Sequence, residues 1–127
     1  MSKILLLEPD RQLADNLKDY FANANHKVYV HSDPQAAIAE ADKNRPDVII
    51  TELQLAGRSG VEFLYEFRSY PDWQAIPVIV TGSVNDQSMS DYTEVFDELN
   101  ISNYFYKPAL QTQELVVAVN NCLELRT

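Results

Sequence analysis

Carboxylates, hydroxyls and one lysine each follow a short apolar run of this chain. If the runs are parallel strands, their carboxyl ends meet at one edge of a sheet, and these side chains converge there. A lysine beside clustered carboxylates, such as Lys107 beside Glu52, partly offsets their mutual repulsion. Exposed strand ends of an acidic protein also collect acids by chance, so each residue alone carries little weight. The candidate residues are Glu8, Asp10, Glu52, Thr81, Ser83 and Lys107.

The elements that would position these side chains can be predicted from the spacing of apolar residues. Short continuous apolar runs are typical of buried strands, whereas apolar residues three and four positions apart are typical of helices. Asp10 and Asp33 each stand where a helix N-cap is expected. The predicted strands cover 4–7, 28–30, 48–50, 77–80 and 103–106, and the predicted helices follow Asp10 and Asp33 and cover 61–69, 89–99 and 112–125.

This alternation predicts an α/β fold in one domain that covers residues 1–127. Continuous apolar strands separated by helices indicate a parallel sheet that is covered on both faces. Right-handed crossovers make a doubly wound (βα)5 sandwich, and we expect the strand order 2-1-3-4-5.

The composition excludes several classes of function. Ten basic residues against nineteen acidic ones give a formal charge of −9, which opposes attraction to nucleic acid or to an anionic membrane. The single cysteine, Cys122, excludes an internal disulfide and a Cys-rich zinc site. The apolar run 4–7 is too short for a signal peptide or a membrane span, so we expect a cytoplasmic protein.

Four stretches of the chain together resemble a known family. They are 3–10 (KILLLEPD), 45–60 (RPDVIITELQLAGRSG), 76–81 (IPVIVT) and 104–108 (YFYKP). In order and spacing they are similar, nearly from end to end, to the response-regulator receiver domain, the phosphoacceptor module of two-component signalling.

The resemblance implies a role for each position of the cluster. In the family, two acids after the first strand and an aspartate after the third bind Mg²⁺, and that aspartate takes a phosphoryl group from a histidine kinase. A hydroxyl after the fourth strand and a lysine before proline hold the acyl phosphate. By position, the acid pair falls on Glu8 and Pro9, the phosphoacceptor on Glu52 and the lysine on Lys107. The hydroxyl falls on Thr81 or, in the family's usual register, on Gly82. The resemblance also implies a backbone carbonyl that binds the metal, at Gln54, and an aromatic side chain that changes rotamer on activation, at Tyr104.

Two departures from the family pattern indicate a degenerate, or pseudo-, receiver. Glu52 replaces the aspartate, and its extra methylene pushes the carboxylate outward, where an error of about 1 Å can cost ~10²-fold in rate. Pro9 has no side-chain oxygen, whereas Mg²⁺ is usually held by one or two carboxylates. We therefore expect weak Mg²⁺ binding at most, with no other cofactor. Asp10 adds a further carboxylate, but as a helix cap it stands one residue too late.

The leading hypothesis is a signalling domain that acts by binding a protein partner, a histidine kinase or a downstream effector, without a normal phosphorylation cycle and without enzymatic activity. The first alternative is an ordinary phosphoaccepting receiver, either alone or as one domain of a longer regulator. The second is a flavodoxin-like nucleotide or flavin binder. That class needs a loop rich in Gly, Ser or Thr after the first strand, and the acidic segment 8–12 is not one.

The expected partner surface is made by helix 89–99, strand 103–106 and the last helix, and homodimerisation through it is one hypothesis. Its aromatic content is typical of interface hot spots. We further expect a cis Lys107–Pro108 bond, surface positions for His26 and His31, a core position for Cys122, and Trp73 beneath the loop before the fourth strand. The residues of the partner surface are Tyr92, Val95, Phe96, Tyr104 and Tyr106.

Overall fold

A five-stranded parallel sheet forms the centre of the computed structural model, which describes residues 1–55 and 57–124. Its order, β2-β1-β3-β6-β7, is the one that the sequence predicts for its five strands. Each main strand begins or ends within two residues of the predicted run. The strands are β1 (Ser2–Leu7), β2 (His26–His31), β3 (Val48–Glu52), β6 (Val78–Gly82) and β7 (Asn103–Tyr106).

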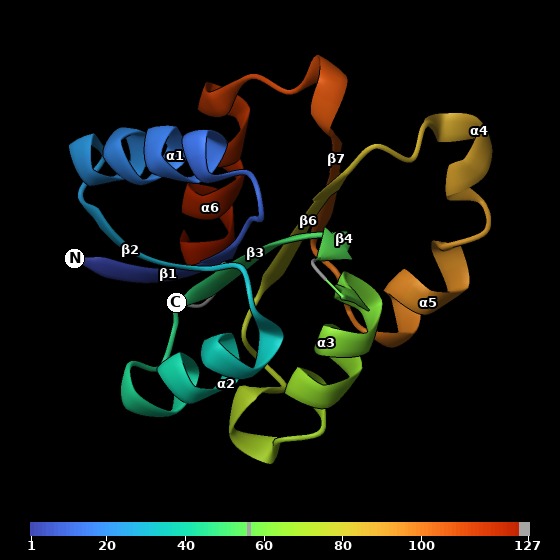
Figure 1. Cartoon of the computed structure of the whole chain (residues 1–127), viewed down its shortest axis with the longest axis horizontal. Coiled ribbons are helices and arrows are strands. Elements are labelled where there is room, and N and C mark those ends of the chain that lie inside the picture. Colours follow the sequence, from blue (N-terminus) through green and yellow to red (C-terminus); the bar gives the residue numbers. More distant parts are fainter. Residues whose placement is uncertain (56, 125–127) are drawn as a thin grey trace.

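Helices cover both faces of the sheet (Figure 1). Helices α1 (Arg11–Asn23) and α6 (Thr112–Glu124) lie on one face, and α2 (Pro34–Lys43) and α3 (Gly60–Arg68) lie on the other. Alternate residues of each strand enter the two apolar cores, so β1 sends Leu5 and Leu7 to one face and Ile4 and Leu6 to the other. Leu125, at the end of the last predicted helix, lies outside the described residues.

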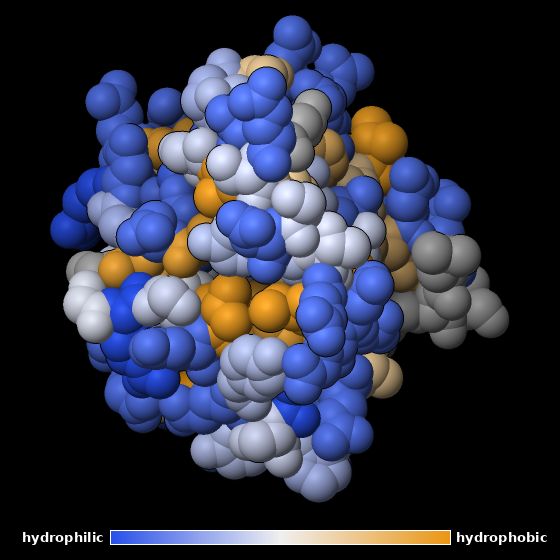
Figure 2. Space-filling model, turned by 90° about the vertical axis from the view of Figure 1, so that its right-hand side faces the viewer, coloured by the Kyte–Doolittle hydropathy of each residue, from blue (hydrophilic) through white to orange (hydrophobic). Residues whose placement is uncertain are grey.

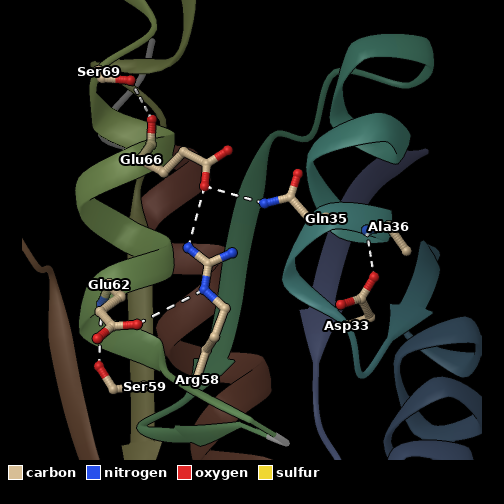
Figure 3. Close-up of polar contacts among 8 residues, drawn as sticks. All are labelled: Asp33, Gln35, Ala36, Arg58, Ser59, Glu62, Glu66 and Ser69. Carbon is tan, nitrogen blue, oxygen red and sulfur yellow. Dashed lines mark hydrogen bonds and ion pairs between the residues drawn. The ribbon is translucent and has the colours of Figure 1, made fainter.

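Helices α1, α2 and α3 each begin at a side-chain cap. Asp10 accepts a hydrogen bond from the Leu13 amide, as the sequence predicts, and Asp33 accepts one from the Ala36 amide (Figure 3). Ser59 caps α3 in the same way. Because each cap satisfies an otherwise unpaired amide, the loops that follow β1, β2 and β3 lead into their helices at defined residues.

A small hairpin separates β3 from α3. Strands β4 (Gln54–Leu55) and β5 (Arg58–Ser59) pair antiparallel. Gly60 follows, and its amide donates to the Leu53 carbonyl at 2.7 Å. A Cβ atom on Gly60 would clash with the Glu52 carbonyl oxygen, so only glycine allows the chain to pass this close behind Glu52.

A network of partly exposed ion pairs joins this hairpin to two helices. Arg58 contacts Glu62 at 3.8 Å and Glu66 at 3.3 Å, and Gln35 of α2 donates to the same Glu66 (Figure 3). Arg58 is therefore engaged on the α2–α3 side of the molecule.

The prediction of one helix over 89–99 is wrong. The segment forms two short helices, α4 (Asp86–Met89) and α5 (Thr93–Glu98), and α5 has no fully buried residue. Asn85 caps α4, and serine and aspartate around its end favour caps and turns over helix interiors. Figure 1 shows both helices on the side of the sheet away from β2.

Arg68 connects the loops before β6 and β7. Its guanidinium donates to the carbonyl oxygens of five residues at 2.7–3.2 Å, and burial lowers its pKa from the ordinary value. Trp73, in the short 3₁₀ helix η1 (Pro71–Trp73), is buried as predicted and stacks on Phe67 with 4.7 Å between ring centroids. The five acceptors of Arg68 are Trp73, Gln74, Ile76, Leu99 and Asn100.

Cys122 lies in the core, which confirms its predicted place, but the surface positions predicted for the histidines are wrong. His26 is 6% exposed, packs edge-on against Phe21 and contacts Asn120 Oδ1 through Nε2 at 3.1 Å. His31 is half-buried and contacts Glu40 at 3.0 Å. The partners lie on helices, Asn120 on α6 and Glu40 on α2. The polar residues that flank each histidine in sequence therefore do not predict whether it is buried.

Candidate functional site

Lys107 lies between two glutamates at the carboxyl end of the sheet. Its Nζ is 2.7 Å from Glu8 Oε1 and 2.8 Å from Glu52 Oε1. Glu8 follows β1, Glu52 ends β3, and Lys107 begins the 3₁₀ helix η2 (Lys107–Ala109) that follows β7. The expected convergence of strand ends is therefore present for these three residues, and the expected contact of Lys107 with Glu52 is confirmed.

The second oxygen of each glutamate has a backbone partner. Glu8 Oε2 accepts the amide of Asp10 at 2.9 Å, and Glu52 Oε2 accepts the amide of Gln54 at 2.7 Å. In both cases the donor stands two residues further along the chain. Glu8 is only 4% exposed and Glu52 only 7%, so both carboxylates depend on these partners to compensate for lost hydration.

The charges of the cluster stabilise the protonated form of Lys107. Burial alone lowers the pKa of its ammonium, but hydrogen bonds to Glu52 and Glu8, together with their charges, outweigh burial and hold that pKa above its ordinary value. Two carboxylates and one ammonium leave this cluster with an excess of one negative charge. The lysine thus supplies the positive charge between the carboxylates.

The strand register separates the two candidates for the hydroxyl position. Thr81 pairs directly with Glu52 across β3 and β6 and is 4% exposed. Paired residues of parallel strands direct their side chains to the same face, so Thr81 lies on the Glu52 side of the sheet. Gly82 lies on the other face, against Tyr104 and Leu53. Thr81 is the hydroxyl that shares a face with Glu52.

Tyr104 points inward, toward the loop that follows β6. Its hydroxyl donates to the Val84 carbonyl at 2.8 Å and accepts the Val84 amide at 3.0 Å. Burial raises the pKa of this phenol, the hydrogen bond with the Val84 backbone lowers it, and the net direction is upward. Neutral Tyr104 therefore ties β7 to the start of the α4 segment.

The donor set does not fit the metal site that the resemblance implies. Asp10 uses one carboxylate oxygen to cap α1, as expected of a helix cap, and its place in the acidic pocket stays a prediction. Pro9 offers no side-chain ligand, and the Lys107 ammonium contacts both remaining carboxylates. Among the described residues, no group of three or more His, Cys, Asp or Glu side chains could hold a metal ion.

The Lys107–Pro108 bond is trans, because no peptide bond of the described residues is cis, and the cis prediction is wrong. The turn after β7 is instead made by η2, in which the Leu110 amide donates to the Lys107 carbonyl at 3.1 Å. The trans form is the one that X–Pro bonds favour by about 0.5–1 kcal/mol. Lys107 reaches both glutamates from this conformation.

A cavity of about 970 Å³ runs along β2 between α1 and α2. Glu8 and Pro9 belong to its lining, whereas Glu52, Thr81 and Lys107 do not. The cavity therefore meets the charge cluster only at Glu8.

Comparison with known proteins identifies the family. The family model for the response regulator receiver domain matches residues 4–120. The chain belongs to this family. It is thus a receiver domain of two-component signalling, a module that transmits signals and generally has no catalytic role of its own.

Curated relatives of this receiver domain are longer than it is. It is 27% identical over 123 residues to the sensory transduction protein RegX3 of Mycobacterium tuberculosis (strain ATCC 25618 / H37Rv), covering 97% of this chain and 51% of the relative. It is 28% identical over 88 residues to the KDP operon transcriptional regulatory protein KdpE of Escherichia coli (strain K12), covering 69% of this chain and 38% of that protein. The receiver domain therefore spans about half of these relatives or less.

Solved structures show the same fold. The chemotaxis response regulator CheY4 of Vibrio cholerae has a TM-score of 0.85 at 20% identity, with 97% of this chain and 99% of that chain covered. The receiver domain of the Francisella response regulator 1452 has a TM-score of 0.87 at 22% identity, with both chains fully covered. No helix of the described part of the chain is long and apolar enough to cross a membrane.

Sequence reasoning missed the backbone groups of the site. The amides of Asp10 and Gln54 hold the outer oxygens of the glutamates, and no side-chain pattern signals them. The hydrogen bonds between Tyr104 and the Val84 backbone were missed too, although glycine at 82 is a signal that another group approaches the strand closely.

Proposed function

We propose that this receiver domain signals by binding a protein partner without a phosphorylation cycle. The observation that carries this proposal is the position of Lys107, whose ammonium lies within 2.8 Å of both Glu8 and Glu52. In this arrangement, Glu52 supplies a fixed negative charge at the phosphoacceptor position, and Lys107 stabilises it. Phosphoryl transfer, by contrast, requires that the attacking oxygen be positioned in line with the phosphoryl group. It also requires that the charge on the transferred phosphoryl be stabilised, commonly by a metal ion.

The charge balance of the cluster supports the proposal. With two carboxylates and one ammonium in direct contact, a divalent cation would have to compete with Lys107 for both acids. Mg²⁺ also demands near-ideal octahedral oxygen geometry and loses its waters reluctantly. Pro9 provides no oxygen that would compensate for this competition, so we infer weak Mg²⁺ binding at most and no other cofactor.

The rival function is an ordinary phosphoaccepting receiver that uses Glu52. It is favoured by the presence of Thr81 and Lys107 on the same side of the sheet as Glu52. It requires, however, that Glu52 release Lys107 and the Gln54 amide before it can attack a phosphoryl group. The two functions differ in one measurable product, a phosphorylated Glu52.

The partner would be a histidine kinase or a downstream effector in the cytoplasm. We place the contact surface on α5, β7 and α6, where Tyr106 is 38% exposed and Tyr92 and Phe96 are half-buried. Aromatic side chains of this kind commonly dominate binding energy at interfaces. A homodimer through the same surface stays a prediction.

Intact-mass spectrometry tests the proposal directly. The chain is incubated with acetyl phosphate and millimolar Mg²⁺, and a receiver that is known to accept phosphate is treated in parallel as a positive control. We expect the mass of this chain to stay unchanged. A gain of one phosphoryl group that disappears in Glu52→Gln would establish the rival function instead.

A further inference from the structure

The stretch between Arg68 and Lys107 carries negative charge alone. Residues 69–106 contain six acidic residues and no Lys, Arg or His. The two flanking cations are already engaged, because Arg68 donates to five carbonyl oxygens and Lys107 contacts Glu8 and Glu52. Within the described residues, this stretch therefore supplies no basic side chain of its own to balance its acids.

Four of these acids surround α5. Asp91, Glu94, Asp97 and Glu98 are all exposed. Within the described chain, Glu98 is the one acid of these four whose carboxylate accepts a side-chain hydrogen bond. The donor is the Tyr65 hydroxyl on α3, at 2.8 Å. Like charges this close repel one another, so the surface gains from any bound group that brings positive charge.

Apolar groups lie among these acids. Tyr92, Phe96 and Tyr104 form a chain of ring contacts, with centroids 5.7 and 5.9 Å apart, and all three are half-buried. No residue of α5 is fully buried. Figure 2 looks at the side on which α4 and α5 lie and shows an apolar patch near the centre, bordered by hydrophilic residues. We call the four acids and three rings the α5 face.

Charge complementarity distinguishes between occupants of the α5 face. In a symmetric dimer the same patch meets itself, so four acids of one copy would lie near four acids of the other. Juxtaposed like charges at an interface cost several kcal/mol. Nucleic acid and anionic membranes meet the same repulsion. A basic protein segment has the opposite charge and can bury its own apolar side chains against the rings.

We propose that the α5 face binds a basic, amphipathic segment of a protein partner, in which Lys or Arg residues flank an apolar stripe. The inference rests on the proposed function, since it specifies the chemistry of the partner through which the domain signals. The four acids of the α5 face would select a basic partner, and the three rings would contribute most of the binding free energy. Electrostatic attraction of this kind speeds association and weakens with salt.

A model peptide tests the proposal. The probe is an amphipathic helix of about 18 residues with a Leu stripe and a Lys face, titrated into the isotopically labelled chain and followed by NMR. We expect amide shifts on α5 and β7, and an affinity that falls at least tenfold between low and physiological salt. A peptide with Glu in place of Lys, and one with Ser in place of Leu, should both fail to bind.

Matched charge variants separate a specific face from the attraction of any cation to an acidic protein. The test variant is Asp91→Asn with Glu94→Gln and Asp97→Asn. The control is Asp15→Asn with Asp19→Asn and Asp42→Asn, three exposed acids on α1 and α2. Both remove three negative charges. We expect the test variant to weaken peptide binding at least tenfold and the control less than threefold.

Three results would overturn the proposal. Equal losses in the two variants, or shifts spread over other faces, would mean generic attraction to an acidic chain. A dimer found by sedimentation at low salt, with shifts on α5, would mean that a second copy occupies the face. None of these results depends on whether the chain gains a phosphoryl group at Glu52. Failure of this proposal is therefore distinguishable from failure of the proposed function.

Discussion

The phenol oxygen of Tyr104 lies 3.0 Å from the point that a Cβ atom on Gly82 would occupy. The same Cβ would approach Leu53 Cβ at 3.2 Å. Both distances are tighter than most contacts of real Cβ atoms, so a side chain at 82 would push Tyr104 or Leu53 away by a few tenths of an ångström. A shift of Tyr104 would disturb its double hydrogen bond with Val84.

We expect Gly82→Ala to displace Tyr104 and to destabilise the chain by about 1–3 kcal/mol, the usual cost of overpacking. Hydrogen exchange at the Val84 amide should become faster, because that amide loses its acceptor. Tyr104→Phe should speed the same exchange without the steric effect, and Ser83→Ala, at an exposed neighbour, should change neither measurement. Unchanged exchange at Val84 in Gly82→Ala would mean that Tyr104 does not have to move.

Lys107→Met should destabilise the fold by about 3 kcal/mol, since it leaves two buried carboxylates without their cation. Urea denaturation measures this, and Lys18→Met, at an exposed lysine of α1, serves as the control. Equal effects of the two substitutions would contradict the central place of Lys107.

The loss of folding stability at alkaline pH should also depend on Lys107. Folding raises the pKa of this lysine, so its contribution is fully present below the unfolded value of about 10.4 and is lost as pH rises through the folded pKa. Wild type should therefore lose stability more steeply than Lys107→Met above about pH 10.4. Parallel curves for the two proteins in urea titrations across this range would contradict the direction of the shift.

The double variant Pro9→Asp with Glu52→Asp should gain a phosphoryl group from acetyl phosphate in the presence of Mg²⁺. It restores a carboxylate after β1 and shortens the acceptor, while Thr81 and Lys107 stay in place. Glu52→Asp alone should do much less, because one carboxylate is still missing. Intact mass measures both, and equal labelling of single and double variants would show that Pro9 is not the defect.

Calorimetric titration of wild type with Mg²⁺ should show no saturation at millimolar concentrations, and the double variant should bind more tightly. Calorimetry suits this experiment better than tryptophan fluorescence. Trp73 precedes β6 and stacks on Phe67, so it lies toward the opposite edge of the sheet from Glu52. Submillimolar binding by wild type would count against the pseudo-receiver.

Arg68→Lys should destabilise the chain by about 3 kcal/mol, because a single ammonium cannot reach five carbonyl oxygens that the planar guanidinium serves. Arg58→Lys, in the partly exposed network with Glu62 and Glu66, should cost less than about 1 kcal/mol. Thermal or urea unfolding of the two variants compares these effects. A similar loss in both would mean that the Arg68 carbonyl contacts contribute little.

The sheet and its order could be predicted because β1, β3 and β6 are continuous apolar runs that suit burial on both faces. Capping by Asp10 and Asp33 was predictable for a similar reason, since a cap is a local hydrogen bond within four residues. The residues Glu8, Glu52 and Lys107 of the candidate site could be predicted from their place after strands.

What could not be predicted depends on contacts between distant segments. Buried His26 contacts the side chain of Asn120, which stands 94 residues further along the chain. Tyr104 fits in its position because Gly82 has no side chain and the Val84 backbone provides hydrogen-bond partners. The break between α4 and α5 was missed because an alternation of acids and aromatics resembles helical spacing, while Ser90 and Asp91 favour a turn.

A counterion that is part of the chain has a fixed local concentration. Lys107 cannot be diluted, chelated or exchanged, so its presence beside Glu8 and Glu52 does not vary with the metal or phosphodonor content of the surroundings. The lifetime of that charge arrangement is the lifetime of the folded chain. Under the proposed function, control over the signal then passes from the chemistry of the site to the abundance of the protein and of its partner.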